Sequence, residues 1–322
     1  MMDIDVYRPK DVDLSEFAHM QQKAFEELLK SMGVDGSFMT PAFYNWKYNG
    51  PFGGAKMVLA KDNGRIVAST VNHALEIQCD GETYRLWQNG DSAMLPEYRG
   101  QGLYHKCVAK AVEALLDNEL IYGFPNANSK RGFSAHVPTD KGIIPLLAAP
   151  SVHPLWASDK NIAEVNSFKD VALNHTAFFR SNKAALTKSR DYLEWRYGTH
   201  PVNRYVSYRY NDVATGSEAV VVTRKADIGG RRVLVVMELL GTCFKAMRKA
   251  VHYAIRRQRT GLATLMFNNS LGITEMMRLG FVKVPPRFLP KTQLLFVHAN
   301  SGRARELLNV PWQIQMGDWD GF

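Results

Sequence analysis

The clearest pattern of hydrophobic and polar positions lies between residues 83 and 115. Residues 83–95 alternate and end in an apolar run, which predicts a strand, and Pro96 ends that strand. From Leu103 onward, apolar residues recur at every fourth position, which predicts an amphipathic helix. Gly100 and Gly102 lie in the loop between the two elements. Because such a loop directs unpaired backbone N–H groups and the positive end of the helix dipole to one point, we expect a phosphate site here.

The first half of the chain reads as a mixed order of strands and helices. A helix at 14–32 is expected to stop at Gly33, and Asp62-Asn63-Gly64 predicts a hairpin turn. The aromatic residues at 44–51 are interpreted as a turn, and the prolines at 145, 150 and 154 predict a domain junction. The other expected elements are strands at 4–8, 56–61, 66–77 and 120–124, a helix at 103–118 and a short helix that ends at Gly132-Phe133.

After the junction, the pattern starts again. Trp195-Arg196-Tyr197 repeats Trp46-Lys47-Tyr48, and Leu279-Gly280-Phe281 repeats Arg131-Gly132-Phe133. A repeat that spans half the chain predicts a duplicated domain. Only Gly241-Thr242-Cys243 separates strand from helix in the second copy, which is too short to wrap a pyrophosphate, so one phosphate site per chain is expected. The elements expected in this copy are helices at 178–192 and 244–257 and strands at 205–210, 220–223, 232–240 and 262–267.

Composition narrows the classes of function only slightly. The 322 residues include 40 Lys and Arg against 31 Asp and Glu, and a net charge of +9 suits a polyanionic ligand but also serves solubility. No basic run is long enough for a nucleic-acid arm, and no apolar stretch approaches transmembrane length, so neither nucleic acid nor a membrane is expected as a partner. The three cysteines and nine histidines form no disulfide or metal motif, and no metal is expected. The first residues do not read as a signal peptide, which predicts a cytoplasmic location.

Residues 99–104, Arg-Gly-Gln-Gly-Leu-Tyr, resemble the Arg/Gln-x-x-Gly-x-Gly/Ala loop of the GNAT acyltransferases. The Leu-Pro-Glu-Tyr before the loop, and the order of the expected elements over about residues 3–150, also look like that superfamily. The resemblance implies an α+β (mixed α/β) fold, in which a twisted, mostly antiparallel sheet is flanked by helices. It also implies that the loop holds the pyrophosphate of an acyl-coenzyme A. The alternative interpretation of the same residues is an ordinary strand–turn–helix joint that uses glycine for the turn.

The resemblance also implies which residues bind the acyl donor. In the family, a backbone N–H near the end of the fourth strand polarises the thioester carbonyl, which implies Met94 or a neighbour here. Asn126 and Ser129 are expected to hydrogen-bond the coenzyme, and Phe133 is expected to line its cleft. The full set of implied donor-binding residues is Ala93, Met94, Leu95, Arg99, Gly100, Gln101, Gly102, Leu103, Tyr104, Asn126, Ser129 and Phe133.

Several residues are candidates for proton transfer. Asp91 is a candidate base or a ligand of the acceptor amine, with a structural alternative in which its carboxylate holds a bulge or a neighbouring side chain. His73 is a second candidate base, and a half-buried strand histidine is its alternative. The family's thiolate-protonating tyrosine corresponds to Asn128, which is a departure from the pattern. Tyr104, where the family has Gly or Ala, is therefore a candidate acid, with a packing role as its alternative.

The acceptor is implied by resemblance alone. Tandem GNAT chains with one intact loop include bacterial sugar-nucleotide N-acyltransferases, and residues 312–320 look similar to the ending of such chains. This implies N-acylation of a nucleotide-linked amino sugar for a cell-surface polysaccharide such as lipopolysaccharide, with Asp318 and Asp320 binding the sugar or capping the terminus. Another small amine, such as an aminoglycoside or polyamine, and a non-catalytic coenzyme A-binding protein remain alternatives. We expect residues 1–150 to bind the donor, and residues 151–322, a degenerate GNAT-like domain, to shape the acceptor site or form a homodimer.

Overall fold

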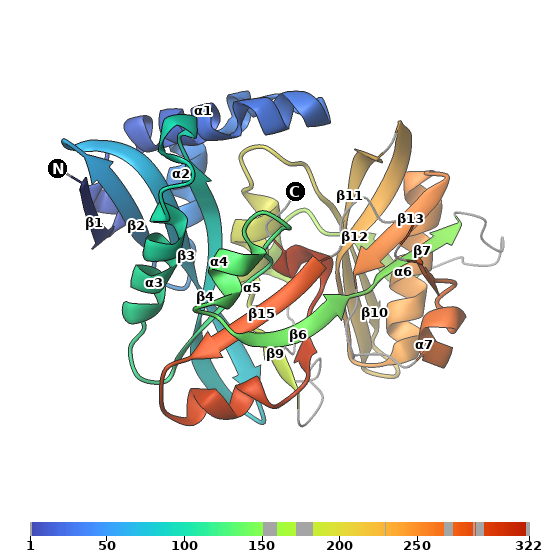
Figure 1. Cartoon of the computed structure of the whole chain (residues 1–322). Coiled ribbons are helices and arrows are strands. Elements are labelled where there is room, and N and C mark those ends of the chain that lie inside the picture. Colours follow the sequence, from blue (N-terminus) through green and yellow to red (C-terminus); the bar gives the residue numbers. More distant parts are fainter. Residues whose placement is uncertain are drawn as a thin grey trace. The chain divides into compact units, whose positions relative to one another are not determined.

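The computed structural model describes residues 2–150, 160–171, 183–228, 230–266, 273–285, 287 and 293–319 (Figure 1). The chain forms two compact units. Unit 1 comprises Met1–Gln78, Glu82–Gly142 and Leu294–Val310, whereas unit 2 comprises Cys79–Gly81, Ile143–Gln293 and Pro311–Phe322. Residues 294–310, from the second half of the chain, therefore belong to the first unit.

Unit 1 is a mixed sheet with helices on both faces, as the expected α+β class requires. Its strand order is β1-β2-β3-β4-β5-β15-β6, and Figure 1 shows β15 beside β6. The strands are β1 (Met2–Tyr7), β2 (Ala55–Asp62), β3 (Arg65–Cys79), β4 (Glu82–Met94), β5 (Glu119–Gly123), β6 (Thr139–Ile144) and β15 (Gln293–Ala299). The helices are α1 (Leu14–Met32), α2 (Pro41–Tyr48), α3 (Leu103–Glu113) and α4 (Lys130–Ser134).

Local sequence explains where the helices of unit 1 begin and end. The Asp13 carboxylate accepts from the N–H groups of Ser15 and Glu16 at the start of α1, and Gly33 ends that helix in the left-handed region at φ 65°. Along β3, Ser69 contacts Gln21 of α1 at 2.8 Å, whereas Asn72 donates to the Ala111 carbonyl of α3 at 3.1 Å. Because side chains alternate along a strand, α1 and α3 cover opposite faces of the sheet.

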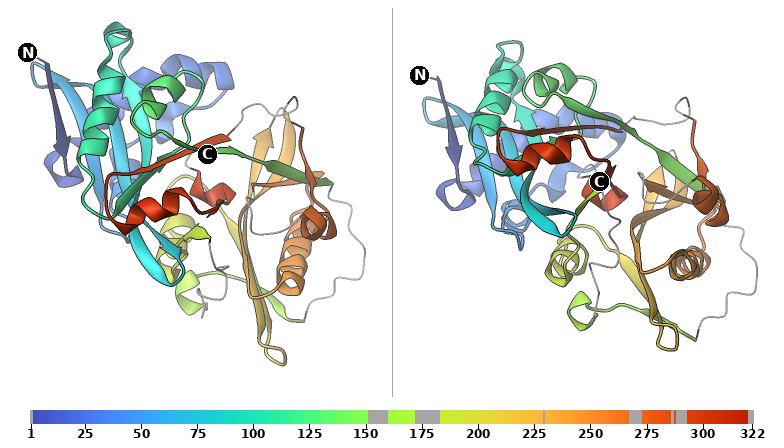
Figure 2. Two further views of the ribbon diagram at one scale, coloured as in Figure 1. Left: turned by 60° about the horizontal axis from the view of Figure 1, so that its bottom comes forward. Right: turned by 90° about the horizontal axis from the view of Figure 1, so that it is seen from below.

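Unit 2 has a second mixed sheet, of order β14-β7-β13-β12-β11-β10-β8, and α6 packs along it (Figure 2). The strands of this sheet are β7 (Leu146–Pro150), β8 (Ile162–Glu164), β10 (Val206–Asp212), β11 (Ser217–Ile228), β12 (Arg231–Gly241), β13 (Leu262–Met266) and β14 (Val282–Lys283). Unit 2 also contains two short strands that are not part of this sheet, β9 (Ala184–Leu186) and β16 (Trp312–Gln313). Its helices are α5 (Arg190–Leu193), α6 (Phe244–Gln258) and α7 (Ile273–Arg278). The order β10-β11-β12-α6-β13-α7 follows that of β2-β3-β4-α3-β5-α4 in unit 1.

Each half of the chain supplies one strand to the other unit's sheet. β7 pairs antiparallel with β13 and β14, so it completes the sheet of unit 2. β15 pairs antiparallel with β5 and completes the sheet of unit 1. The chain returns to unit 2 after Val310, where β16 pairs in parallel with β9.

Two expected elements differ in the structure. The aromatic residues at 44–51 were expected to form a turn, but Pro41–Tyr48 is a helix, because the Thr40 hydroxyl caps it and Pro41 occupies its first turn. Residues 178–182 of the helix expected at 178–192 lie outside the described residues. Within the remainder, Ala184–Leu186 is a strand that pairs with Trp312 and Gln313, and only Arg190–Leu193 is helical. Strand pairing from a distant part of the chain overrides the local helical pattern there.

Candidate active site

The glycine loop joins β4 to α3 through two residues in the left-handed region. Gly100 has φ 79° and Gly102 has φ 72°, and a Cβ atom built on either glycine would meet nothing within 4 Å. Gly102 is the N-cap of α3 and provides no side-chain cap, so the first N–H groups of this helix have no side-chain acceptor. Two hydrogen bonds fix the loop: Arg99 donates to the Ala24 carbonyl at 3.0 Å, and Gln101 donates to the Glu97 carbonyl at 3.3 Å. Open space at the two glycines and uncapped N–H groups therefore occur together at the start of α3, as an anion site requires.

Beside this loop, two parallel strands part. β4 and β5 pair from Arg85 and Glu119 to Asn89 and Gly123. β5 ends at Gly123, whereas β4 continues to Met94 without that partner. The last residues of β4, including Ala93 and Met94, therefore line an opening between two strands. An opening of this kind gives a flexible chain access to backbone N–H groups that are otherwise used in strand pairing.

The end of β4 contains a bulge. Asn89 and Ser92 both contact the Thr70 hydroxyl of β3, at 3.0 and 2.7 Å, although strict alternation would place them on opposite faces. Asp91 lies between them at φ 46°, an uncommon conformation for a residue other than glycine. One extra residue in the strand therefore turns Ser92 to the face that α3 covers.

The Asp91 carboxylate points to the opposite face, where α2 holds it. Lys47 Nζ lies 2.9 Å from Oδ1 and 2.7 Å from Oδ2, and the Tyr48 hydroxyl donates to Oδ2 at 2.7 Å. The Asp91 carbonyl accepts from Gln21 at 3.0 Å and from Ser69 at 2.8 Å. Lys47 is 5% exposed and Gln21 is fully buried, so this network belongs to the core. From the sequence, residues 46–48 could stack on a nucleobase or sugar, but the repetition of Lys47-Tyr48 at Arg196-Tyr197 in the half without a glycine loop favours structural packing.

Tyr104 occupies the space beside the opening. Its ring lies against α4, where a Cβ on Gly132 would come within 2.7 Å of it. Burial raises the pKa of the Tyr104 phenol to about 12, and hydrogen bonds with Ser129 and Ser92 oppose that shift. The hydroxyl therefore carries its proton at neutral pH and lies between β4 and α4. Burial raises the pKa of the nearby Cys107 thiol to about 12, which disfavours the reactive thiolate form.

The remaining candidate residues have different surroundings. Asn126 accepts from the N–H groups of Asn128 and Ser129 at 2.9 and 3.0 Å, so it shapes the turn before α4. Phe133 is 2% exposed, and its ring leaves no room for a side chain at Gly123. His73 is 4% exposed and lies on the opposite face of β3 from Asn72, so the structure does not bring it to Tyr104.

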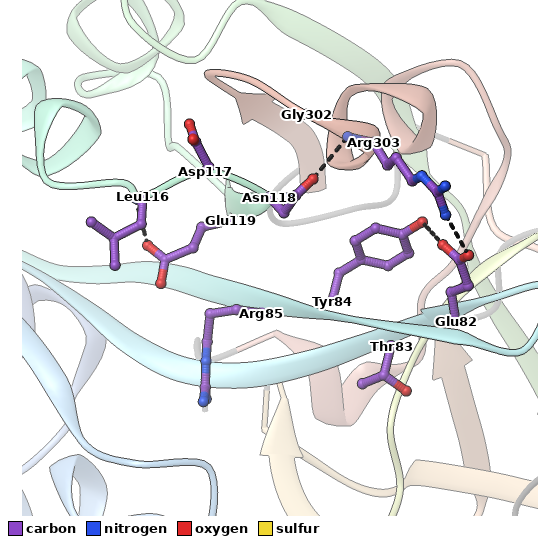
Figure 3. A pocket seen from close by; sticks show the side chains of 10 residues that line it. All are labelled: Glu82, Thr83, Tyr84, Arg85, Leu116, Asp117, Asn118, Glu119, Gly302 and Arg303. Atoms are coloured by element: carbon purple, nitrogen blue, oxygen red, sulfur yellow. Dashed lines mark hydrogen bonds and ion pairs between the residues drawn. The ribbon is translucent and has the colours of Figure 1, made fainter.

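A separate hollow of about 630 Å³ lies at the other end of β4 (Figure 3). Its polar groups already bind one another. The Glu82 carboxylate accepts from the Tyr84 hydroxyl at 2.5 Å and from Arg303 at 3.0 Å, and Asn118 accepts from the Arg303 N–H at 2.8 Å. This hollow therefore offers few open donors to a phosphate and is not the site that the glycine loop forms.

The residues near the end of the described chain in unit 2 pair with one another. Asp318 is 1% exposed, binds Lys188 and accepts from the Gln315 N–H at 2.8 Å, as the capping alternative expects. Asp320 lies outside the described residues. Within the described ranges, no three His, Cys, Asp or Glu side chains gather closely enough to hold a metal ion. In the same ranges, no helix combines the length and the apolar character that crossing a bilayer needs.

Comparison with known proteins identifies the fold. No family model matches the chain, and no curated protein matches it in sequence. A conserved protein of Enterococcus faecalis, described as a probable N-acyltransferase, has a TM-score of 0.65 at 11% identity over 94% of this chain and 74% of that chain. A GCN5-related N-acetyltransferase from Anabaena variabilis has a TM-score of 0.61 at 10% identity, over 92% and 72%. Eis1 from Mycobacterium abscessus has a TM-score of 0.53 at 11% identity, over 91% and 73%. The chain therefore has the GNAT fold.

Proposed function

We propose that this protein is an acyl-coenzyme A-dependent N-acyltransferase whose donor binds unit 1. One observation carries the proposal: the uncapped start of α3 and the opening between β4 and β5 lie on either side of the same loop. The loop N–H groups and the helix dipole suit a pyrophosphate, and the opening suits the extended pantetheine arm beyond it. The fold neighbours support this reading, since they are described as N-acyltransferases and N-acetyltransferases.

The proposed reaction uses residues that line the opening. A backbone N–H near Met94 donates to the thioester oxygen as it becomes an oxyanion. The acceptor nitrogen attacks the carbonyl carbon, a C–N bond forms and the C–S bond breaks. The Tyr104 hydroxyl donates its proton to the departing sulfur and regains one through Ser92 or Ser129, while the amine releases a proton to solvent. The products are an amide and free coenzyme A.

The proposed acceptor is the amine of a nucleotide-linked amino sugar in the cytoplasm. This part rests on the resemblance of residues 312–320 to chains with that activity, and on the net charge of +9, which suits a second pyrophosphate ligand. Another small amine is the alternative acceptor. Because Asp318 is buried against Lys188, we assign the acceptor no contact with it.

We also propose that the chain arose by duplication and kept one donor site. The two units share an order of elements, but only Thr242 and Cys243 separate β12 from α6. Gly241 is packed closely at the end of β12, because a side chain there would collide with Met247 at 2.5 Å. Unit 2 is then left to shape the acceptor site or to form a dimer interface.

Thiol release tests the proposal directly. Purified protein is incubated with acetyl- and longer acyl-coenzyme A, together with a panel of nucleotide-linked amino sugars, aminoglycosides and polyamines, and free thiol is measured. We expect release that depends on the amine, fastest with an amino sugar. Donor binding without release for any amine would favour a non-catalytic coenzyme A-binding protein, and absence of donor binding would refute the proposal.

A further inference from the structure

The same three side-chain types meet in both units. In unit 1, the Asp91 carboxylate of β4 binds Lys47 Nζ at 2.7 Å and the Tyr48 hydroxyl at 2.7 Å. In unit 2, the carboxylate of Glu238 on β12 binds Lys188 Nζ at 2.7 Å and the Tyr197 hydroxyl at 2.6 Å. β4 and β12 hold the same place in the order of elements of their units. A carboxylate, a tyrosine and a lysine therefore form a repeated anchor.

Both anchors lie at a bulge. In β12, Glu238 pairs with Val222 and Val236 pairs with Thr223, which leaves Met237 as an extra residue. In β4, the positive φ of Asp91 marks the corresponding irregularity. A bulge leaves backbone groups without ladder partners and bends its strand, so it needs support from outside the ladder. In each unit, a tyrosine and a lysine supply that support through the adjacent carboxylate.

The unit without the glycine loop shows which role these residues serve. Glu238 is fully buried and Lys188 is 3% exposed, and only Thr242 and Cys243 lie between β12 and α6, with no glycine loop. The anchor in unit 2 therefore has no coenzyme to act on. Its retention there indicates that it holds a strand in place rather than transferring a proton.

We infer that Asp91 is a positioning residue, fixed by Lys47 and Tyr48, that holds the bulge of β4 in register, and that it does not take the proton of the acceptor amine. Both oxygens of its carboxylate already accept from α2, and its side chain is only 16% exposed. Gln21 and Ser69 bind its carbonyl from the same face of the sheet. The effect of this anchor on catalysis rests on the proposed function.

The register of β4 matters because two parts of the site depend on it. Ser92 contacts Thr70 at 2.7 Å because the extra residue turns it to the face that α3 covers, and α3 is the helix that carries Tyr104. The backbone N–H near Met94, which is the proposed oxyanion donor, comes shortly after Ser92 along β4 and therefore depends on the same register. A shift of one residue in a strand reverses every side chain beyond it. Losing the anchor would therefore move both the acid and the oxyanion donor, although neither touches Asp91.

Kinetics distinguish a positioning residue from a base. We expect Lys47→Met, Tyr48→Phe and Asp91→Asn each to lower kcat by about tenfold or more. The double variant Asp91→Asn/Tyr48→Phe should have a kcat little lower than that of the worse single variant, since the residues act as a unit. The shape of the pH–rate profile should survive in all of them. A loss of about a hundredfold confined to Asp91→Asn, together with disappearance of one limb of the profile, would overturn the inference.

Amide hydrogen exchange tests the anchor without any substrate. Exchange in residues 89–95 should quicken about tenfold or more in Lys47→Met and Tyr48→Phe. Glu119→Gln is the matched control, because it disrupts another half-buried pair of this sheet, with Lys56 at 2.8 Å, and should leave residues 89–95 protected. Unchanged exchange in the Lys47 and Tyr48 variants would overturn the anchor. If the wild-type protein released no thiol but these variants still quickened exchange, the proposed function would fail and the anchor would stand.

Discussion

A single side chain, Tyr104, occupies a position where the related loops have Gly or Ala. Its ring fills the space over Gly132, and Ser129 and Ser92 partly oppose the rise in the pKa of its hydroxyl that burial causes. Asn128, which corresponds to the family's tyrosine, is exposed and donates its backbone N–H to Asn126. Under the proposed function, Tyr104 of α3 would supply the phenol that the GNAT pattern has at the position of Asn128, which would account for both departures.

Tyr104→Phe should lower kcat about a hundredfold while leaving the Michaelis constant for the donor nearly unchanged, because the ring remains and only the proton donor is lost. Since the pKa of Tyr104 is raised to about 12, wild-type activity should not fall through loss of this proton between pH 7 and 9. Thiol release at saturating substrates measures both. Tyr84→Phe is the matched control: its pKa is also about 12, through Glu82, but it lies in the separate hollow and should keep full activity.

Gly102→Asp should abolish donor binding, because its carboxylate would enter the open space before α3 and repel the pyrophosphate. Forcing a side chain to φ 72° also costs about 1 kcal/mol. Gly64→Asp separates the two effects, since Gly64 has φ 85° and equally open space but lies in a distant hairpin. Calorimetric titration should show lost affinity only for Gly102→Asp, and equal loss in both variants would count against the site.

Arg99→Ala should weaken donor binding less, by about 1–3 kcal/mol if its guanidinium also makes a charge-assisted bond to the donor. Part of that group already donates to the Ala24 carbonyl at 3.0 Å, so the loop should also become less rigid. The same titration measures the loss, and an affinity equal to that of the wild type would show that Arg99 only supports the loop.

At the scale of elements, one lysine hydrogen-bonds the segment 294–310, which belongs to unit 1. Lys141 of β6 donates to the carbonyls of Leu308 and Val310 at 2.5 and 2.9 Å, just after the 3₁₀ helix Arg303–Leu308. Lys141→Met should lower the free energy of unfolding by about 2 kcal/mol, because half-buried carbonyls lose a charged donor. Urea denaturation measures this. Lys110→Met, which removes an exposed pair with Glu113 at 3.5 Å, should change stability by less than about 0.5 kcal/mol.

The elements around the glycine loop were predictable because their signals are local. Helical periodicity from Leu103 and the glycines of the loop identified α3 and its start, and Gly33 marked the end of α1. β9 was missed because it forms by pairing with residues such as Trp312 and Gln313, which lie far along the chain. The partners of Asp91 were missed for a similar reason: Lys47 and Tyr48 reach it from α2, and no spacing along the sequence reveals which carboxylate a buried lysine will meet.

For the whole molecule, one donor site per chain is expected despite the duplicated order of elements. Calorimetry with coenzyme A should give a stoichiometry of one, and Gly102→Asp should reduce it to zero. Because the turn at Thr242 and Cys243 is short and Gly241 is closed by Met247, the second unit has no equivalent loop. A stoichiometry of two for the wild-type protein would contradict the proposal that unit 2 lost its site.

Because β15 completes the sheet of unit 1 but lies late in the sequence, the order of synthesis determines when that sheet can be completed. A ribosome delivers residues 1–142 long before β15 at Gln293–Ala299, so during synthesis the edge of β5 stays unpaired while most of unit 2 is made. An unpaired strand edge attracts other chains. During synthesis, unit 1 therefore passes through a period in which its sheet is incomplete and its edge is open to other chains. Two nascent chains on one message can then trade β15 and emerge joined.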